Sequence, residues 1–358
     1  MRRMDSDARA DLSRAITNAS RGTLEAECQG LLRRPYEAAL SYIGAALEFK
    51  AAAEIATVMG TTDVAAEKHL DAAQCFLNGD NTAEADRCVR LAMDLLEGQN
   101  GRARFAHVRS RIEPLQRELR AVVQEEIAIR RAIQGRAGGV RQVDPRFVEE
   151  SLGRFPGLPL LHYCASIQVL ERGDADLAFQ HAEIARLLQP WDARWWAALA
   201  YVLLQSERPE EGLQVANHAL ELFRTDPRLR SLAGVCAYDR ALKKRTRAAL
   251  EEARELLDVA TKGEALDSAE RLRLLMLRTD SEYRLREYAQ ATRSIDQAQS
   301  LLDQNPSLDQ YPAFKVLRDQ LPIARRRLAR AGSHPPRTAA GLWSADVIAA
   351  NRPLVRIA

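Results

Sequence analysis

Apolar residues recur along most of the chain at the spacing of one helix face, and many of the segments that carry this pattern end at a proline. Between residues 159 and 171, Leu160, Ile167 and Leu170 belong to such a pattern, which predicts a helix. A turn at Gly173 then leads into a second helical pattern that stops at Pro190. No segment combines period-two alternation with β-branched enrichment, so the pattern predicts an all-α protein.

Small residues mark one side of the second predicted helix. Ala178, Ala182 and Ala185 lie at i, i+4 and i+7, and therefore share one stripe. Side chains this small let a neighbouring helix approach closely. Ala182 and Ala185 recur as Ala216 and Ala219, 34 residues further on, which predicts a repeated helix pair.

Further copies of the pair follow and precede these two. The third begins at Arg228, and its second half is interrupted by the basic run 243–247 before a helix resumes at 248. The fourth has a clear second helix, with Ala291 and Ala298 before Pro306. Fainter copies are predicted at 69–92 and around 36–45, and the pattern of 102–136 predicts a helix pair interrupted at Pro114.

These units resemble the tetratricopeptide repeat family. The resemblance rests on Gly173, Ala178, Ala185 and Pro190 in one unit, on Trp196, Leu199, Ala216 and Ala219 in the next, and on Ala291 and Ala298 later. It implies a right-handed α-solenoid of stacked helix-turn-helix units, with Trp196 as a packing residue and the first helix of each pair lining a concave side. Gly212 departs from the family pattern, which prefers alanine at that position.

Glycine and proline divide the chain into four predicted regions. We expect an N-terminal helical region with degenerate hairpins at 1–136, a glycine-rich linker at 137–145, the repeat array at 146–330 and a tail at 331–358. Two sub-arrays would then join near 135–145. The tail carries scattered apolar residues around Leu342 and Trp343, which suit either docking back on the array or contact with a partner.

Composition and motifs argue against catalysis. The 52 Lys and Arg residues nearly balance 49 Asp and Glu, so the net charge of +3 calls for neither nucleic acid nor an anionic membrane. No phosphate-binding glycine loop, HExxH metal motif or GxSxG nucleophile turn occurs. The five cysteines form no CxxC pair and are interpreted as small buried residues in a reducing compartment. We predict no enzyme activity, no cofactor, no metal and a cytoplasmic location.

The predicted concave side carries aromatic residues interleaved with arginine. These side chains suit the capture of a peptide, although each tyrosine could equally pack between helices. The predicted partner-binding residues are Tyr163, Ile167, Arg194, Trp195, Tyr201, Arg228 and Tyr238. A family subtype grips a C-terminal carboxylate with Lys and Asn, but Tyr163, Ile167 and Ala198 occupy the corresponding stretches here.

Two function classes follow from this sequence. The first is a non-enzymatic scaffold or adaptor that binds a protein or peptide in the groove of the array. The second is a regulatory sensor that responds to a peptide or small ligand and controls an effector on another chain. Nucleic acid is not favoured as a partner because the basic runs 243–247 and 325–327 lack interleaved aromatic residues. The sequence predicts no membrane partner, and it does not identify the partner, the pathway or the oligomeric state.

Overall fold

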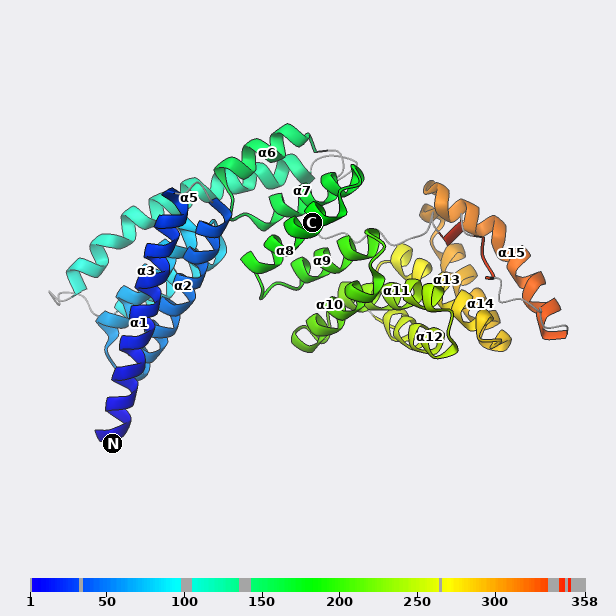
Figure 1. The fold of residues 1–358 in the computed structure, drawn as a ribbon, viewed down its shortest axis with the longest axis horizontal. Helices are drawn as coiled ribbons and strands as arrows, with labels where there is room; N and C mark the ends of the chain where they lie inside the picture. The colour runs from blue at the N-terminus through cyan, green and yellow to red at the C-terminus, as the bar shows by residue number, and fades with distance from the viewer. Residues whose placement is uncertain are drawn as a thin grey trace. The chain divides into compact units, whose positions relative to one another are not determined.

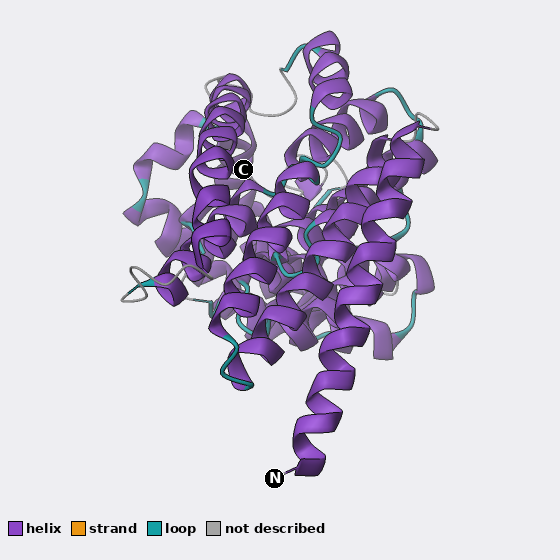
Figure 2. Cartoon of the chain, turned by 90° about the vertical axis from the view of Figure 1, so that its left-hand side faces the viewer, coloured by secondary structure: helices purple, strands orange, loops and turns teal. Residues whose placement is uncertain are grey.

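A computed structural model describes residues 2–31, 35–97, 105–134, 143–263, 266–333, 341–344 and 347–348. In these ranges the chain forms α-helices, one short 3-10 helix and connecting turns, with no strand (Figure 2). The helices follow one another in the order shown in Figure 1. The chain divides into two compact units, Met1–Gln189 and Pro190–Ile357, and each is described by itself.

Unit 1 contains eight helices in its described residues. The first four helices pack in chain order, α1 on α2, α2 on α3 and α3 on α4. Helix α5 packs on α3 and α4, and α8 packs on both α7 and α2. The bounds are α1 Arg2–Leu31, α2 Pro35–Val58, α3 Thr62–Asn78, α4 Thr82–Leu96, α5 Ala106–Gln134, α6 Pro145–Arg154, α7 Pro159–Glu171 and α8 Ala175–Leu188.

In its described residues, unit 2 contains three helical hairpins followed by a further helix. Within each hairpin the two helices pack together, and the first helices also pack on one another, α9 on α11 and α11 on α13. The bounds are α9 Ala193–Gln205, α10 Pro209–Leu222, α11 Pro227–Lys244, α12 Arg247–Thr261, α13 Ser268–Arg284, α14 Tyr288–Gln304, η3 Pro306–Gln310 and α15 Pro312–Ser333. The fold is therefore the predicted all-α array of stacked hairpins.

Short polar side chains and prolines start these helices. Asp174, Asp192 and Asp226 each accept a hydrogen bond from a backbone N–H in the first turn of the helix that follows. Proline occupies the first position of α7, α10 and α11, where a helix has no need of the missing N–H. Because these signals are local, the predicted helix at 159–171 matches α7 in both bounds.

The predicted small-residue stripes lie inside the packing. Ala178, Ala182 and Ala185 in α8 are completely buried, as are Ala216 and Ala219 in α10. In α14 the corresponding residues Ala291 and Ala298 are buried as well. The second helix of each pair therefore turns its alanines inward, where they permit close approach of the neighbouring helix.

Close packing explains why position 212 of α10 is glycine where the family pattern has alanine. A Cβ atom added at this position would lie 3.0 Å from the Cys236 sulfur of α11 and 3.1 Å from the carbonyl oxygen of Ala200 in α9. The carbonyl belongs to a helix backbone and cannot move without shifting α9. The three helices thus meet more closely at this point than an alanine would allow.

Three expectations differ from the structure. Residues 106–134 form a single helix that continues through Pro114 rather than a pair; Pro114 is exposed, and the buried Leu115 and Leu119 anchor the helix in the core. The third hairpin has a complete second helix, α12, whose start is set by Arg245 in the left-handed conformation and by Thr246 as the N-cap. Cys28 is exposed, whereas the other four cysteines are buried as expected.

The boundaries of the compact units also differ from the expected regions. The division falls at 189/190 rather than near 135–145, because α8 packs back on α2 and Asp80 accepts a hydrogen bond of 2.8 Å from the Gly157 backbone N–H. Of the expected linker 137–145, only residues 143–145 lie within the described part of the chain. In the tail, Leu342, Trp343 and Val347 are buried in the core of α13, α14 and α15, so these residues dock on the array.

The close approach at Gly212 predicts opposite effects for two glycine-to-alanine substitutions. Gly212→Ala should lower stability by about 1 kcal/mol, because overpacking outweighs the gain of roughly 0.5–1 kcal/mol in helix propensity. Gly153→Ala in α6, where an added Cβ meets nothing within 4 Å, should raise stability. Thermal unfolding followed by circular dichroism measures both. A Gly212→Ala chain as stable as the Gly153→Ala chain would contradict this packing.

Candidate functional site

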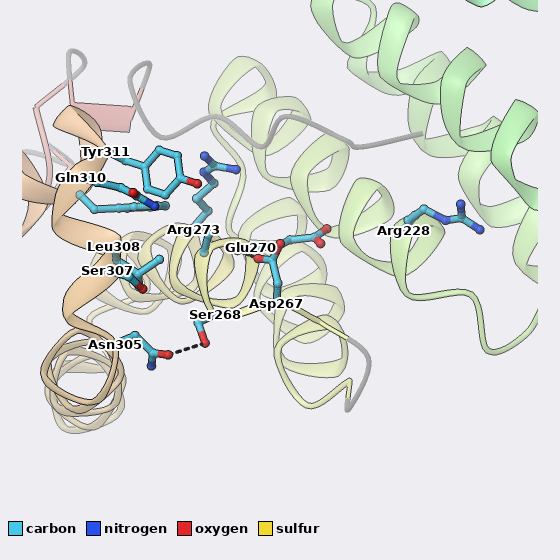
Figure 3. A pocket seen from close by; sticks show the side chains of 12 residues that line it. Arg228, Asp267, Ser268, Glu270, Arg273, Asn305, Ser307, Leu308, Gln310 and Tyr311 are labelled. Carbon is cyan, nitrogen blue, oxygen red and sulfur yellow. Dashed lines mark hydrogen bonds between the residues drawn. The ribbon is translucent and has the colours of Figure 1, made fainter. Parts of the chain in front are cut away.

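A cavity of about 390 Å³ opens within unit 2 at the N-terminal ends of α11, α13 and α15 (Figure 3). It therefore draws side chains from the first helices of two successive hairpins and from α15, the helix that follows them. The lining residues are Arg228, Asp267, Ser268, Ala269, Glu270, Arg273, Asn305, Ser307, Leu308, Gln310, Tyr311 and Phe314. We call the surface made by α11, α13 and α15 on this side of unit 2 the first-helix face.

The start of α13 fixes the polar side chains of the cavity. Asp267 is the N-cap of α13, and its Oδ1 accepts a 2.7 Å hydrogen bond from the Glu270 backbone N–H. The spacing of these two residues is that of a capping box. The hydroxyl of Ser268 donates to the Asn305 side-chain oxygen over 3.2 Å, the bond drawn in Figure 3. This second hydrogen bond links the end of α14 to the beginning of α13.

Aromatic rings and a guanidinium form another side of the cavity. The Arg273 guanidinium carbon lies 5.1 Å from the centre of the Phe314 ring, within cation–π range. Tyr311 meets Phe314 edge-on, with ring centres 5.9 Å apart. Phe314 is completely buried, whereas Tyr311 is 40% exposed. Tyr311 therefore offers an aromatic surface held by a fixed ring beneath it.

Charges of both signs face each other across the cavity. Arg228 is paired with Asp226 over 2.7 Å and lies beyond Glu270 in Figure 3. Burial raises the pKa of Glu270, and the nearby Asp267 adds to this, while a hydrogen bond from Ser231 and the charges of Arg273 and Arg228 act in the opposite direction. The site can therefore donate and accept hydrogen bonds and stack an apolar side chain.

The described residues carry no cluster suited to metal binding, and burial suppresses the ionisation of two of their thiols. No group of three or more His, Cys, Asp or Glu side chains among them could hold a metal ion. Burial raises the pKa of Cys88 to about 11 and that of Cys164 to about 12, so both thiols stay protonated near neutral pH. Among the same residues, no helix is long and apolar enough to cross a membrane.

The seven predicted binding residues are distributed over both units. Tyr163 and Ile167 lie in α7 of unit 1, and the remaining five lie in α9 and α11 of unit 2. Five are buried, with exposures from 0% to 4%: Tyr163, Ile167, Trp195, Tyr201 and Tyr238. Substituting these tyrosines would test packing before it tested binding, and their partner-binding role stays a prediction.

Arg194 and Arg228 are the two predicted residues that keep a partly exposed side chain. Arg194 is paired with Asp192 over 2.6 Å and its guanidinium lies 5.4 Å from the Trp195 ring centre. Arg228 lines the cavity. Trp196 is buried as the resemblance implied, and its indole N–H donates to the Pro190 carbonyl over 2.8 Å. Trp191, in contrast, is 39% exposed.

Several cavity residues were not anticipated. The capping-box spacing of Asp267 and Glu270 is a local signal that could have located the start of α13. No local signal places Tyr311 and Arg273 together, because they are separated by the whole of α14. In unit 1, His162 and His181 also meet, with 3.2 Å between their Nδ1 atoms, and burial lowers the pKa of His162 to about 4.

Comparison with known proteins gives only loose structural similarities. No protein-family model matches the chain, and no curated protein matches it. Among solved structures it is similar to the TPR2AB-domain:pHSP90 complex of yeast Sti1, with 14% identity, 74% of this chain and 98% of that chain covered, and a TM-score of 0.29.

Two other solved structures resemble the chain to the same degree. The TPR domain of P58(IPK) shows 11% identity over 80% of this chain and 84% of that one, with a TM-score of 0.29. The Cut9–Hcn1 hetero-tetramer of the APC/C shows 13% identity, coverages of 97% and 88%, and a TM-score of 0.28. At such TM-scores the assignment of the fold rests on the helix pairing of this chain itself.

The raised pKa of Glu270 predicts a pH-dependent effect of Glu270→Gln. A partly buried carboxyl with a raised pKa stabilises the folded chain below its unfolded pKa of about 4.3 and loses that contribution as pH rises through the folded pKa. Relative to wild type, Glu270→Gln should therefore gain stability as pH rises above about 4. Urea unfolding at several pH values measures this, with Glu149→Gln at an exposed position of α6 as control. A difference that does not grow with pH would contradict the burial of this carboxyl.

Proposed function

We propose that the protein is a non-enzymatic interaction scaffold that binds an extended peptide segment of a protein partner on the first-helix face of unit 2. The observation that supports this most is the cavity shared by α11, α13 and α15. A binding site built across several repeats is what a stacked helical array offers and a single hairpin lacks.

The chemistry of the cavity suits a peptide of mixed character. Tyr311 supplies a partly exposed ring on which an apolar side chain can pack. Arg273 and Arg228 supply positive charge, and Glu270 supplies an acceptor near them. Both signs of charge within one cavity match a peptide backbone and polar side chains better than a continuous polyanion.

The charge pairing elsewhere in unit 2 also favours a protein partner over nucleic acid. Lys244 pairs with Glu210 over 2.7 Å, Arg247 with Glu251 over 2.8 Å, and Arg325 with Asp296 over 2.6 Å. These pairs place a carboxylate beside each of the basic runs that could have contacted phosphates. Counterion release from such paired side chains would contribute little to phosphate binding.

A regulatory sensor is the second candidate, and the docked tail favours it. Leu342, Trp343 and Val347 occupy a core formed by α13, α14 and α15, which include two helices of the proposed binding face. A segment of the chain that competes with a partner for this face would make binding conditional. The proposed partner-binding surface is the same in both candidates.

Capture from a lysate of the source organism tests the proposed surface. Tyr311→Ala should lower the recovery of the specific partner at least tenfold, because it removes the exposed ring while leaving the buried Phe314 in place. Leu222→Ala in α10, at a position that is 58% exposed, is the matched control and should retain the partner. Equal recovery with both variants, each confirmed as folded by circular dichroism, would contradict binding at this face.

A further inference from the structure

A short C-terminal segment is held on the first-helix face by hydrogen bonds to its backbone. The Leu342 N–H donates to Asp280 Oδ1 over 2.6 Å, and the Trp343 N–H makes a longer bond of 3.4 Å to the same oxygen. Arg327 of α15 donates to the Leu342 carbonyl over 2.8 Å. One acid of α13 and one base of α15 thus bind the backbone N–H and the carbonyl of the same residue, Leu342.

Asp280 is a fully buried carboxylate that keeps other donors besides this segment. Its Oδ2 accepts a 2.8 Å hydrogen bond from the Tyr238 hydroxyl of α11 and pairs with Arg284. Burial raises the pKa of Tyr238, which keeps this hydroxyl protonated as a donor. Because Tyr238 and Arg284 both bind Oδ2, Asp280 keeps these two partners when the segment leaves, whereas its Oδ1 exchanges the Leu342 and Trp343 N–H groups for water.

The side chains of the segment also make defined contacts with the array. The Trp343 indole N–H donates to the carbonyl oxygen of Met276 over 3.0 Å, and Leu342 is only 1% exposed. Gly341 lies so close to Asp280 and Arg284 that an added Cβ would clash with the Arg284 guanidinium and lie 2.9 Å from Asp280 Oδ1. A side chain at position 341 would have to displace the Arg284 guanidinium from Asp280, so the contact favours glycine, followed by Leu and Trp.

The contacts of this segment and the cavity follow one side of α13. Arg273 borders the cavity, and Met276, Asp280 and Arg284 follow it at steps of three and four residues. The segment runs from Arg284 toward Met276, and so points along α13 toward the cavity. One extended peptide could therefore contact both places.

We propose that the C-terminal segment is an intramolecular ligand of the first-helix face, and that a partner segment of the same chemistry, Gly followed by Leu and Trp in the same bent form, replaces it. This inference rests on the proposed function and names the class of peptide that the face binds. A tethered ligand acts at an effective concentration of roughly millimolar. It therefore prevents weakly binding partners from occupying the face, whereas tightly binding partners displace it.

Binding of a labelled peptide to the full-length chain tests this proposal. The probe is a fluorescein-labelled peptide with the sequence of residues 339–349, followed by fluorescence anisotropy. In the Gly341→Val chain the new side chain competes with the Arg284–Asp280 pair and weakens docking of the segment, so this chain should bind the probe at least tenfold more tightly than wild type. Gly153→Val, at a position in α6 with open space around it, should match wild type.

The peptide itself provides the second control. A probe with alanine at the position of Trp343 should bind the Gly341→Val chain at least tenfold more weakly. If the folded Gly341→Val chain binds the probe no more tightly than wild type does, the segment is a fixed part of the core and the proposal is overturned. Loss of the partner on Tyr311→Ala would still support the proposed function in that case.

A measurement on the unaltered chain covers the case in which Gly341→Val does not fold. Hydrogen–deuterium exchange of wild type is followed with and without an excess of isotope-labelled 339–349 peptide. Displacement predicts faster exchange in fragments of the chain that contain Leu342 and Trp343. Exchange that stays unchanged at saturating peptide would overturn the proposal.

Discussion

Alanine side chains determine how closely the two helices of each hairpin approach, and the rest of the structure depends on that approach. In α8 and α10 the stripe residues, such as Ala182 and Ala216, are completely buried. A hairpin alone leaves an apolar flank exposed, and the next hairpin covers it, so stacking continues along the array. At Gly212 the helices approach more closely still, since even a methyl group would be too large where α9, α10 and α11 meet.

This close packing also limits where a binding site can form. The first helices are enclosed over most of their length: the residues from Trp195 to Leu204 in α9 are all buried. Polar side chains become accessible mainly at helix ends, where caps hold them in place. The cavity lies at such ends, with the Asp267 cap and the Tyr311 ring contributed by neighbouring turns. In a site of this kind the caps fix the positions of the side chains while their polar groups stay accessible to a partner.

Local signals predicted the helices well but the exposure of their residues less well. The recurrence of Ala182 as Ala216 and the prolines at helix starts identified the hairpins, because both depend only on nearby residues. Tyr201 and Tyr238 were expected on an open side, but a helical period shows which face is apolar and not how many neighbours enclose it. The contact between Leu342 and Asp280 joins residues 62 positions apart, which no local pattern indicates.

Site-specific photo-crosslinking in cells of the source organism tests most directly whether the first-helix face is the partner-binding surface. A benzophenone amino acid replaces Tyr311 on this face or Val259 of α12, which are 40% and 51% exposed and so equally open to attachment. The structure predicts a specific protein crosslink from position 311 and none from 259. A crosslink from 259 alone would place the partner on the second helices and contradict the account.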